Sequence, residues 1–227
     1  MTDYLAYRSQ IVRIGREDQP VSIVDGFAAD PDALRDAAIA ATFEPAAQHY
    51  PGIRAPLPAE YLRAQLPVVA QALARNFGRF RRIHVIDASF SIVTSPAAAL
   101  LPRQRLPHVD AYGTDRIALV HYLGLDTVDG TAFYRHRATG FETVDDTRAD
   151  AYFAAVGRET DEVAPPPGYI AGDTPTFACI ERIDARYNRA LLYRSYALHS
   201  GAIAADASLS SDPARGRLTV TGFFALE

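Results

Sequence analysis

Ile83-His-Val-Ile-Asp-Ala-Ser-Phe-Ser-Ile-Val-Thr94 is the first of the stretches that decide the fold class of this 227-residue chain. It is rich in β-branched and aromatic residues, which favour strands. Five similar stretches follow, at residues 116–123, 130–137, 176–183, 189–199 and 217–224. Many short strands in succession are typical of a β-sandwich or jelly roll. We therefore predict a mainly β fold with helices packed on its outside.

The segment before residue 81 predicts supporting elements. Residues 10–26 have the pattern of a strand and turn. Asp30 suits the N-cap of a helix that runs to about Ala41. A second amphipathic helix is predicted over residues 59–76, with Pro67 expected to kink or split it.

The acidic stretch 143–175 interrupts the strands and predicts a short helix over residues 150–158. The sequence contains no repeat and no sign of a second core. We therefore predict one domain over residues 1–227, with the N-terminal strand and supporting helices in 1–80 and the β core in 81–227.

Composition excludes several classes of function. The net charge of −4 does not suggest a nucleic-acid partner, and no apolar stretch approaches the roughly 18 residues of a membrane span. All 23 basic residues are arginine, so Schiff-base and P-loop lysine chemistry are excluded. Cys179 is the single cysteine, and the first residues lack the order of a secretory signal. A cytoplasmic location is expected, and the oligomeric state stays open.

Charge is distributed unevenly along the chain. Arginine predominates between residues 54 and 105, and acidic residues predominate between 126 and 162. This pattern is consistent either with a patchy solvated surface or with a funnel that attracts an anionic substrate.

The chain has six histidines, and the most informative of them is His108 in the motif His108-Val-Asp110. Alternate residues of an extended segment share a face, so this imidazole and carboxylate can reach one ion. His199 follows the apolar run 189–198 and supplies a second histidine. Two histidines and one carboxylate make the facial triad of a non-haem Fe(II) site. Each of the three could alternatively have only a structural role.

Arg217 and Thr219 are two residues apart on the last predicted strand, so they face the same way. A guanidinium fork and a hydroxyl can together hold a carboxylate. An arginine at the start of a strand can also be an exposed surface residue without a binding role. Arg215, two residues earlier, is an alternative candidate for binding the carboxylate.

The order of these motifs resembles the Fe(II)/2-oxoglutarate-dependent oxygenases, and the prolyl 4-hydroxylase-like branch in particular. The resemblance covers about residues 83–225, and it includes the strand 117–124 and the following Asp129-Gly-Thr-Ala-Phe133. Together with His49-Tyr-Pro-Gly-Ile-Arg54, the pattern also resembles a bacterial family of that superfamily with no assigned function. The chain departs from the pattern of the prolyl 4-hydroxylase-like branch in two ways. His199 and Arg217 are 18 residues apart (217 − 199), and Asp129 replaces the first glycine of a Gly-Gly pair.

The resemblance implies a double-stranded β-helix, a cupin-like jelly-roll barrel, that holds Fe(II) on His108, Asp110 and His199. It further implies 2-oxoglutarate as co-substrate, held by Arg217 and Thr219, and its conversion to succinate and CO2. The retained carboxylate of Asp110 favours hydroxylation, since halogenating relatives lose it. A peptide, protein side chain or amino acid is slightly favoured over another small molecule as substrate.

Further candidates have weaker support. Tyr122 could bond the 2-oxoglutarate carboxylate or be a half-buried tyrosine. Tyr50 and Arg54 lie on a proline-fixed loop that could cover the mouth of the site or serve as scaffold. Arg135 and His136 end a strand that could touch the substrate or lie at a solvated edge. Two other functions stay open: a metal- or ligand-binding barrel without turnover, and an interaction module with structural histidines.

Overall fold

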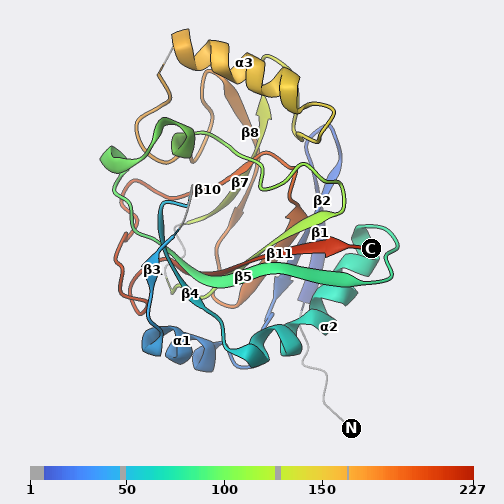
Figure 1. The fold of residues 1–227 in the computed structure, drawn as a ribbon, viewed down its shortest axis with the longest axis vertical. Coiled ribbons are helices and arrows are strands. Elements are labelled where there is room, and N and C mark those ends of the chain that lie inside the picture. Colours follow the sequence, from blue (N-terminus) through green and yellow to red (C-terminus); the bar gives the residue numbers. More distant parts are fainter. Residues whose placement is uncertain (1–7, 47–49, 126–128, 163) are drawn as a thin grey trace.

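The fold is built on two antiparallel β-sheets, as Figure 1 shows. The structure is a computed structural model, and it describes residues 8–46, 50–125, 129–162 and 164–227. The strands of the larger sheet are β1 (Arg8–Ile14), β2 (Gln19–Asp25), β3 (Glu44–Pro45), β4 (Gly52–Pro56), β5 (Ile83–Val93), β6 (Arg116–Tyr122), β9 (Arg189–Arg194) and β11 (Leu218–Leu226). Those of the smaller sheet are β7 (Gly130–His136), β8 (Phe177–Asp184) and β10 (His199–Gly201). The helices are α1 (Pro31–Ala40), α2 (Ala59–Asn76) and α3 (Ala149–Glu162), with 3-10 turns at Ala97–Ala99 and Pro102–Arg105.

The strand order of the larger sheet is β1-β2-β9-β6-β11-β5-β4-β3, and that of the smaller sheet is β10-β7-β8. The predicted mainly β fold with flanking helices is therefore confirmed. Strand pairing among the described residues does not close the two sheets into a barrel. No described helix has the length and apolarity needed to cross a membrane.

The larger sheet is covered by helices on one face and by the smaller sheet on the other. Phe90 and Val220 alternate along their strands with polar neighbours, and they join Leu73 of α2 in one buried cluster on the helix side. On the opposite face, Tyr193 packs with Phe133 of the smaller sheet in a second cluster. The side-chain period of two thus separates a helix-facing core from an inner layer between the sheets.

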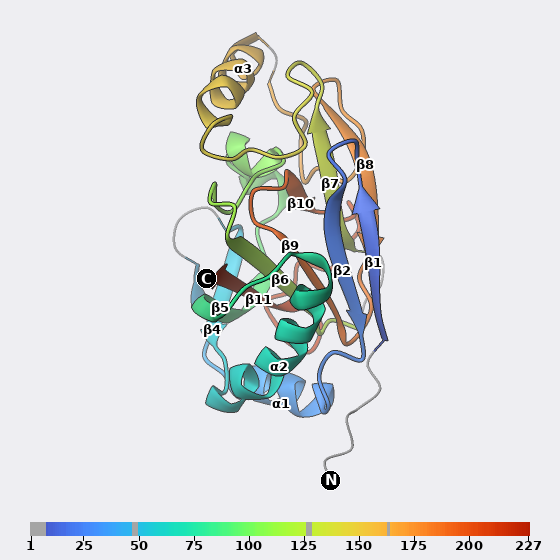
Figure 2. The same ribbon diagram turned by 90° about the vertical axis from the view of Figure 1, so that its right-hand side faces the viewer.

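Helix α3 lies at the end of the molecule away from α1 and α2 (Figures 1 and 2). Its Tyr152 packs with Tyr134 of β7 and Leu198 in a third buried cluster. The inner layer therefore has one end near α3 and the other near the N-terminal helices.

The N-terminal predictions are confirmed in most respects. Residues 10–26 form the hairpin of β1 and β2, and the Asp30 side chain accepts a hydrogen bond from the Ala33 amide as an N-cap. Helix α2 covers the predicted 59–76, but it continues through Pro67. Both Pro67 and Arg63, whose carbonyl loses its helical partner, are exposed, so water can satisfy that carbonyl.

The predicted strand 189–199 is wrong in its length. β9 ends at Arg194, where the Ala197 amide donates to the Arg194 carbonyl in a turn, and His199 opens β10 in the other sheet. The last strand, β11, pairs with β5 and β6 of the larger sheet and so lies in a different sheet from His199. The turn and the non-local pairing move His199 from the end of one sheet to the edge strand of the other.

Candidate metal centre

The backbone places the two predicted histidine ligands side by side. The His108 amide donates to the His199 carbonyl at 2.9 Å, and the His199 amide donates back to the His108 carbonyl at 3.0 Å. The Asp110 amide donates to the Ser195 carbonyl at 2.8 Å. The extended segment around His108 therefore continues the smaller sheet beyond β10, and the turn that ends β9 holds Asp110.

The side chains of His108, Asp110 and His199 converge, as the sequence predicted, with one ligand atom from each within 4.8 Å of the others. Nε2 of His108 is 3.6 Å from Oδ1 of Asp110, and Nε2 of His199 is 3.4 Å from Oδ2. Two ligand atoms that each lie about 2.1 Å from an ion at a right angle are about 3 Å apart. The three side chains need only a small adjustment to bind one divalent ion.

Hydrogen bonding fixes which nitrogen of His199 can bind a metal. Its Nδ1 lies 2.9 Å from the Ala197 carbonyl, which can only accept, so Nδ1 carries the proton. Nε2 is then a lone-pair donor directed toward Asp110. A backbone carbonyl on the other ring nitrogen is the usual means of orienting a metal-binding histidine.

The electrostatics of the group favour metal-binding protonation states. Burial lowers the pKa of His199 to about 4, although Asp110 opposes this shift, so the imidazole is neutral at physiological pH. Burial alone would raise the pKa of Asp110, but His199, His108 and Arg54 together hold it below its usual value. Only 15% of the Asp110 side chain is exposed, against 54% for His108. The group is thus covered on the Asp110 side and open to solvent at His108.

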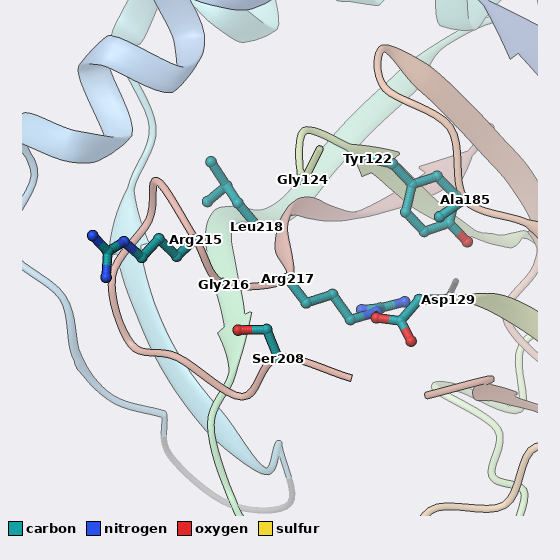
Figure 3. Close-up of a pocket in the computed structure, with 9 residues that line it drawn as sticks. All are labelled: Tyr122, Gly124, Asp129, Ala185, Ser208, Arg215, Gly216, Arg217 and Leu218. Carbon is teal, nitrogen blue, oxygen red and sulfur yellow. The ribbon is translucent and has the colours of Figure 1, made fainter. Parts of the chain in front are cut away.

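Arg217 points into the interior from just before β11, as Figure 3 shows, whereas Arg215 points away from it. One Arg217 nitrogen, Nη2, donates to the Gly130 carbonyl at 3.0 Å. The guanidinium lies 5.8 Å from the centre of the Tyr122 ring. The Arg215 side chain is 82% exposed, with Asp212 3.7 Å away. The structure therefore separates the two rival arginines, and Arg217 is the one in the interior.

Arg217 already has a carboxylate partner within the protein. Its Nε lies 3.3 Å from Oδ2 of Asp129, which balances the charge. The direction of this contact is outside hydrogen-bond geometry, so Nε has no hydrogen-bond acceptor among the residues that the structure describes. A cavity of about 10 Å³ adjoins the pair, enough for about one water molecule.

Thr219 and Tyr122 lie in the inner layer, and both hydroxyls already have protein partners. The Thr219 hydroxyl donates to the Ser91 carbonyl at 3.2 Å. The Tyr122 hydroxyl is 2.7 Å from the Thr131 hydroxyl, and the ring is fully buried. Tyr122 thus supports the Arg217 guanidinium with its ring.

Tyr50 and Arg54 are also placed at the inner layer. The guanidinium carbon of Arg54 lies 4.7 Å from the centre of the Tyr50 ring. The Tyr50 hydroxyl and the Arg54 Nε are both buried, and neither makes a well-directed hydrogen bond within the described part of the chain. His49, the first residue of the same motif, lies outside the described residues.

Arg135 and His136 lie at the end of β7 and have partners outside the metal group. His136 is buried, with Nε2 2.8 Å from Glu159 of α3 and Nδ1 2.9 Å from the Thr139 hydroxyl. Arg135 donates to Glu142 at 3.1 Å. Their described contacts join β7 to α3 and to the loop after β7.

Two residues of the site carried no signal in the sequence analysis. The buried Tyr193 ring packs edge-on against His199, with ring centres 4.8 Å apart. Asp129 was noted only as a departure from a glycine pair, yet it is the charge partner of Arg217. Tyr193 is two residues after Leu191, so the alternation of side chains along a strand could have placed both on the inner face. The contact between Tyr193 and His199 depends on the turn between them and could not have been predicted in this way.

The fold and the site define a mainly β protein with a two-histidine, one-carboxylate group suited to a metal ion. The chain belongs to the family of unknown function DUF6445, whose model matches residues 5–224. No curated protein matches it.

Proposed function

We propose that this protein is an Fe(II)- and 2-oxoglutarate-dependent oxygenase that hydroxylates a small-molecule or peptide substrate. The observation that carries the proposal is the convergence of His108, Asp110 and His199 in a chain whose Arg217 points into the same inner layer. Two histidines and one carboxylate are the protein ligands of non-haem Fe(II) oxygenases.

The path of the chain supports a double-stranded β-helix. From β5 onward, the chain crosses from the larger sheet to the His108 segment beside β10, returns through β6, and passes to β7 and β8. It then returns through β9, crosses to β10 and ends in β11 of the larger sheet. Repeated crossing between two facing antiparallel sheets is the course of a jelly roll.

The ligand group fits a catalytic metal better than a structural one. Structural zinc sites are closed by four protein ligands, whereas catalytic sites leave a position open. The described residues contribute three ligand atoms here, and the His108 side chain is 54% exposed. Asp110 and His199 would hold the ion from the covered side, and the positions that the three residues do not occupy would be open to a co-substrate and oxygen.

Arg217 has the position needed for the distal carboxylate of 2-oxoglutarate. β10 pairs with β7 so that His199 is opposite Phe133 and Gly201 is opposite Thr131. Arg217 reaches the next β7 residue, Gly130, and its Nη2 is 3.8 Å from the point that a Cβ on Gly201 would occupy. His199 and Gly201 are separated by about 7 Å along the strand, which a five-carbon dicarboxylate can span. The incoming carboxylate would share Arg217 with Asp129.

When bound, iron and 2-oxoglutarate would supply the oxidising power: O2 gives one oxygen atom to the substrate and one to succinate, and CO2 is released. The protein's part is positioning. His199 is held by the Ala197 carbonyl, the Asp110 amide is held by the turn after β9, and Tyr122 supports Arg217. The covered interior keeps water away from the co-substrate side.

The test begins with anaerobic addition of Fe(II) and then 2-oxoglutarate, which should produce a visible metal-to-ligand absorption band. Admission of O2 should convert 2-oxoglutarate to succinate, slowly without substrate. His108→Ala and His199→Ala should abolish both signals while circular dichroism stays unchanged. Metal binding without succinate under any condition would favour the binding barrel, and an absence of metal binding would favour structural histidines.

A further inference from the structure

Arg54 and Tyr50 present two hydrogen-bond donors to the inner layer. Nε of Arg54 and the hydroxyl of Tyr50 are buried, and neither makes a well-directed hydrogen bond to a described residue. The side chains of Ser91 and Thr219 lie close enough to the Tyr50 hydroxyl to lower its pKa, although burial raises it overall. The guanidinium stacks over the ring at 4.7 Å, so both groups belong to one locus. A buried donor that stays unpaired costs stability, and an oxygen of a ligand can remove this cost.

A row of directly opposed residues connects this locus with the proposed co-substrate site. Arg54 is opposite Ser91, Ser91 is opposite Thr219, and Thr219 is opposite Tyr122. Directly opposed residues lie on the same face of a sheet, here the face toward the smaller sheet. Neighbouring strands are about 4.8 Å apart, so the Arg54 backbone lies about 10 Å from that of Thr219.

Arg54 lies on the same inner face as Thr219 and Tyr122, two strands away from Thr219 across the larger sheet. Its side chain is 30% exposed, so the guanidinium can also be reached from solvent. Two cationic side chains therefore serve the inner layer from different strands: Arg217 before β11 and Arg54 on β4.

The charge of Arg54 is only weakly neutralised. Among the described residues its ion-pair partner is Asp87, at 3.7 Å, with 56% of the Asp87 side chain exposed. Exposed pairs at such distances contribute little. A single guanidinium suits a single carboxylate, whereas phosphate dianions are usually bound by clusters of arginines.

We propose that Arg54, together with the Tyr50 hydroxyl, binds a carboxylate of the substrate, so that the molecule oxidised at the metal is an anion. This inference rests on the proposed oxygenase function and adds the substrate class to it. Nε–H of Arg54 and O–H of Tyr50 both donate to the carboxylate. The polar row then leads from this anchor toward the metal and the co-substrate.

The test uses a panel of N-acetylated amino acids and short peptides in which every carboxylate compound has a carboxamide counterpart. Binding is measured by calorimetry on the full chain loaded with Mn(II), under argon and with saturating 2-oxoglutarate. At least one carboxylate compound should bind ten or more times as tightly as its counterpart. Arg54→Gln should weaken the binding of that carboxylate compound by ten- to a hundredfold. The ratio between the Kd values of the carboxamide and the carboxylate should then approach one.

Two further variants separate recognition from folding. Arg54→Lys keeps the charge without the fork and should give an intermediate ratio. Arg63→Gln removes an arginine whose side chain is 77% exposed on α2, and it should keep the wild-type ratio. Circular dichroism and the thermal midpoint show whether each variant is folded.

The inference is overturned if no carboxylate compound is preferred, or if Arg54→Gln keeps the preference. It is also overturned if Arg54→Gln weakens the binding of 2-oxoglutarate and leaves that of the panel compound unchanged, because Arg54 would then bind the co-substrate. Succinate formation by the wild type, measured separately with Fe(II) and O2, decides the proposed oxygenase function. Succinate without a carboxylate preference refutes only the inference, and a preference without succinate refutes only the oxygenase.

Discussion

His108 and His199 form a hydrogen-bonded pair across two neighbouring extended segments, each donating its amide to the other's carbonyl. Their rings lie 4.4 Å apart between centres. Residues 91 positions apart in the chain are thereby fixed as neighbours by the backbone alone (199 − 108). The two imidazoles are held in place before any metal arrives, and this preorganisation lowers the cost of binding one.

Metal binding should therefore stabilise the folded protein. At a free metal concentration about a hundred times its Kd, the free energy of unfolding should rise by about 3 kcal/mol. For a chain of this size the thermal midpoint would increase by roughly 5–10 °C. Mn(II) or Fe(II) under argon would show this in a thermal melt, and a chelator should reverse it. His199→Ala should abolish the shift.

His84→Ala is the matched control for this measurement. His84 is exposed, and its partner is Glu227 at the chain's last residue, 3.0 Å away. The metal-induced shift should be unaffected in this variant. An equal loss of the shift in both variants would mean that the metal binds histidines nonspecifically.

Arg217 and Arg215 should differ in their effect on 2-oxoglutarate. Arg217→Lys keeps the charge but loses the fork that contacts Gly130 and Asp129, so the Kd for 2-oxoglutarate should rise on the order of tenfold. Arg215→Lys changes a side chain that is 82% exposed and should leave the Kd unchanged. Calorimetry with the Mn(II)-loaded protein under argon measures both values. The opposite order would assign the co-substrate to Arg215.

Local patterns in the sequence predicted most elements and the ligand group. Residues 59–76 have helical spacing, and α2 has these bounds. His108 and Asp110 share a face because they are two apart in an extended segment, and their convergence needs no long-range information. The side chain of Asp30 likewise acts on an amide only three residues away.

Features that depend on pairing between distant strands were not predictable. The run 189–199 contains no glycine or proline, so nothing local marks the turn at residues 195–197. The partners of β11 are β5 and β6, which are distant in sequence. Asp129 could be identified as the partner of Arg217 only once both strand ends were placed.

Close packing beside Tyr50 and Arg54 predicts that Gly52 is required. A Cβ at this position would lie 2.0 Å from the Ile92 carbonyl oxygen of β5. Gly52→Ala must push β4 away from β5, and we expect a loss of roughly 1–3 kcal/mol in the free energy of unfolding. Denaturant unfolding measures this loss.

Gly157→Ala in helix α3 is the control, because a Cβ there has no described atom of another segment within 4 Å. It should stabilise the protein by roughly 0.5–1 kcal/mol through helix propensity. If both variants were destabilised, the close contact at Gly52 would not explain the loss in the free energy of unfolding.

The buried His121 should make stability depend on pH. Its Nδ1 is 3.1 Å from the Tyr61 hydroxyl and its Nε2 is 3.1 Å from Oδ1 of Asn188. Asn188 Oδ1 also accepts from the Ala28 amide, which assigns the His121 proton to Nε2 and leaves Nδ1 to accept from Tyr61. Burial lowers the pKa of His121 from 6.5 to about 4, so the neutral ring is the form that the fold accommodates.

The sign of the effect follows from this lowered pKa. Between pH 6.5 and about 4 the unfolded chain takes up a proton at His121 and the folded chain does not. The stabilisation is complete above pH 6.5 and is lost as the pH falls, by up to roughly 3 kcal/mol in total. Denaturant unfolding of the wild type and of His121→Gln from pH 8 to pH 4 measures this contribution. His199 shifts in the same direction in both proteins, so the difference between their slopes isolates His121. Parallel slopes would show that His121 takes up its proton equally in the folded and unfolded states.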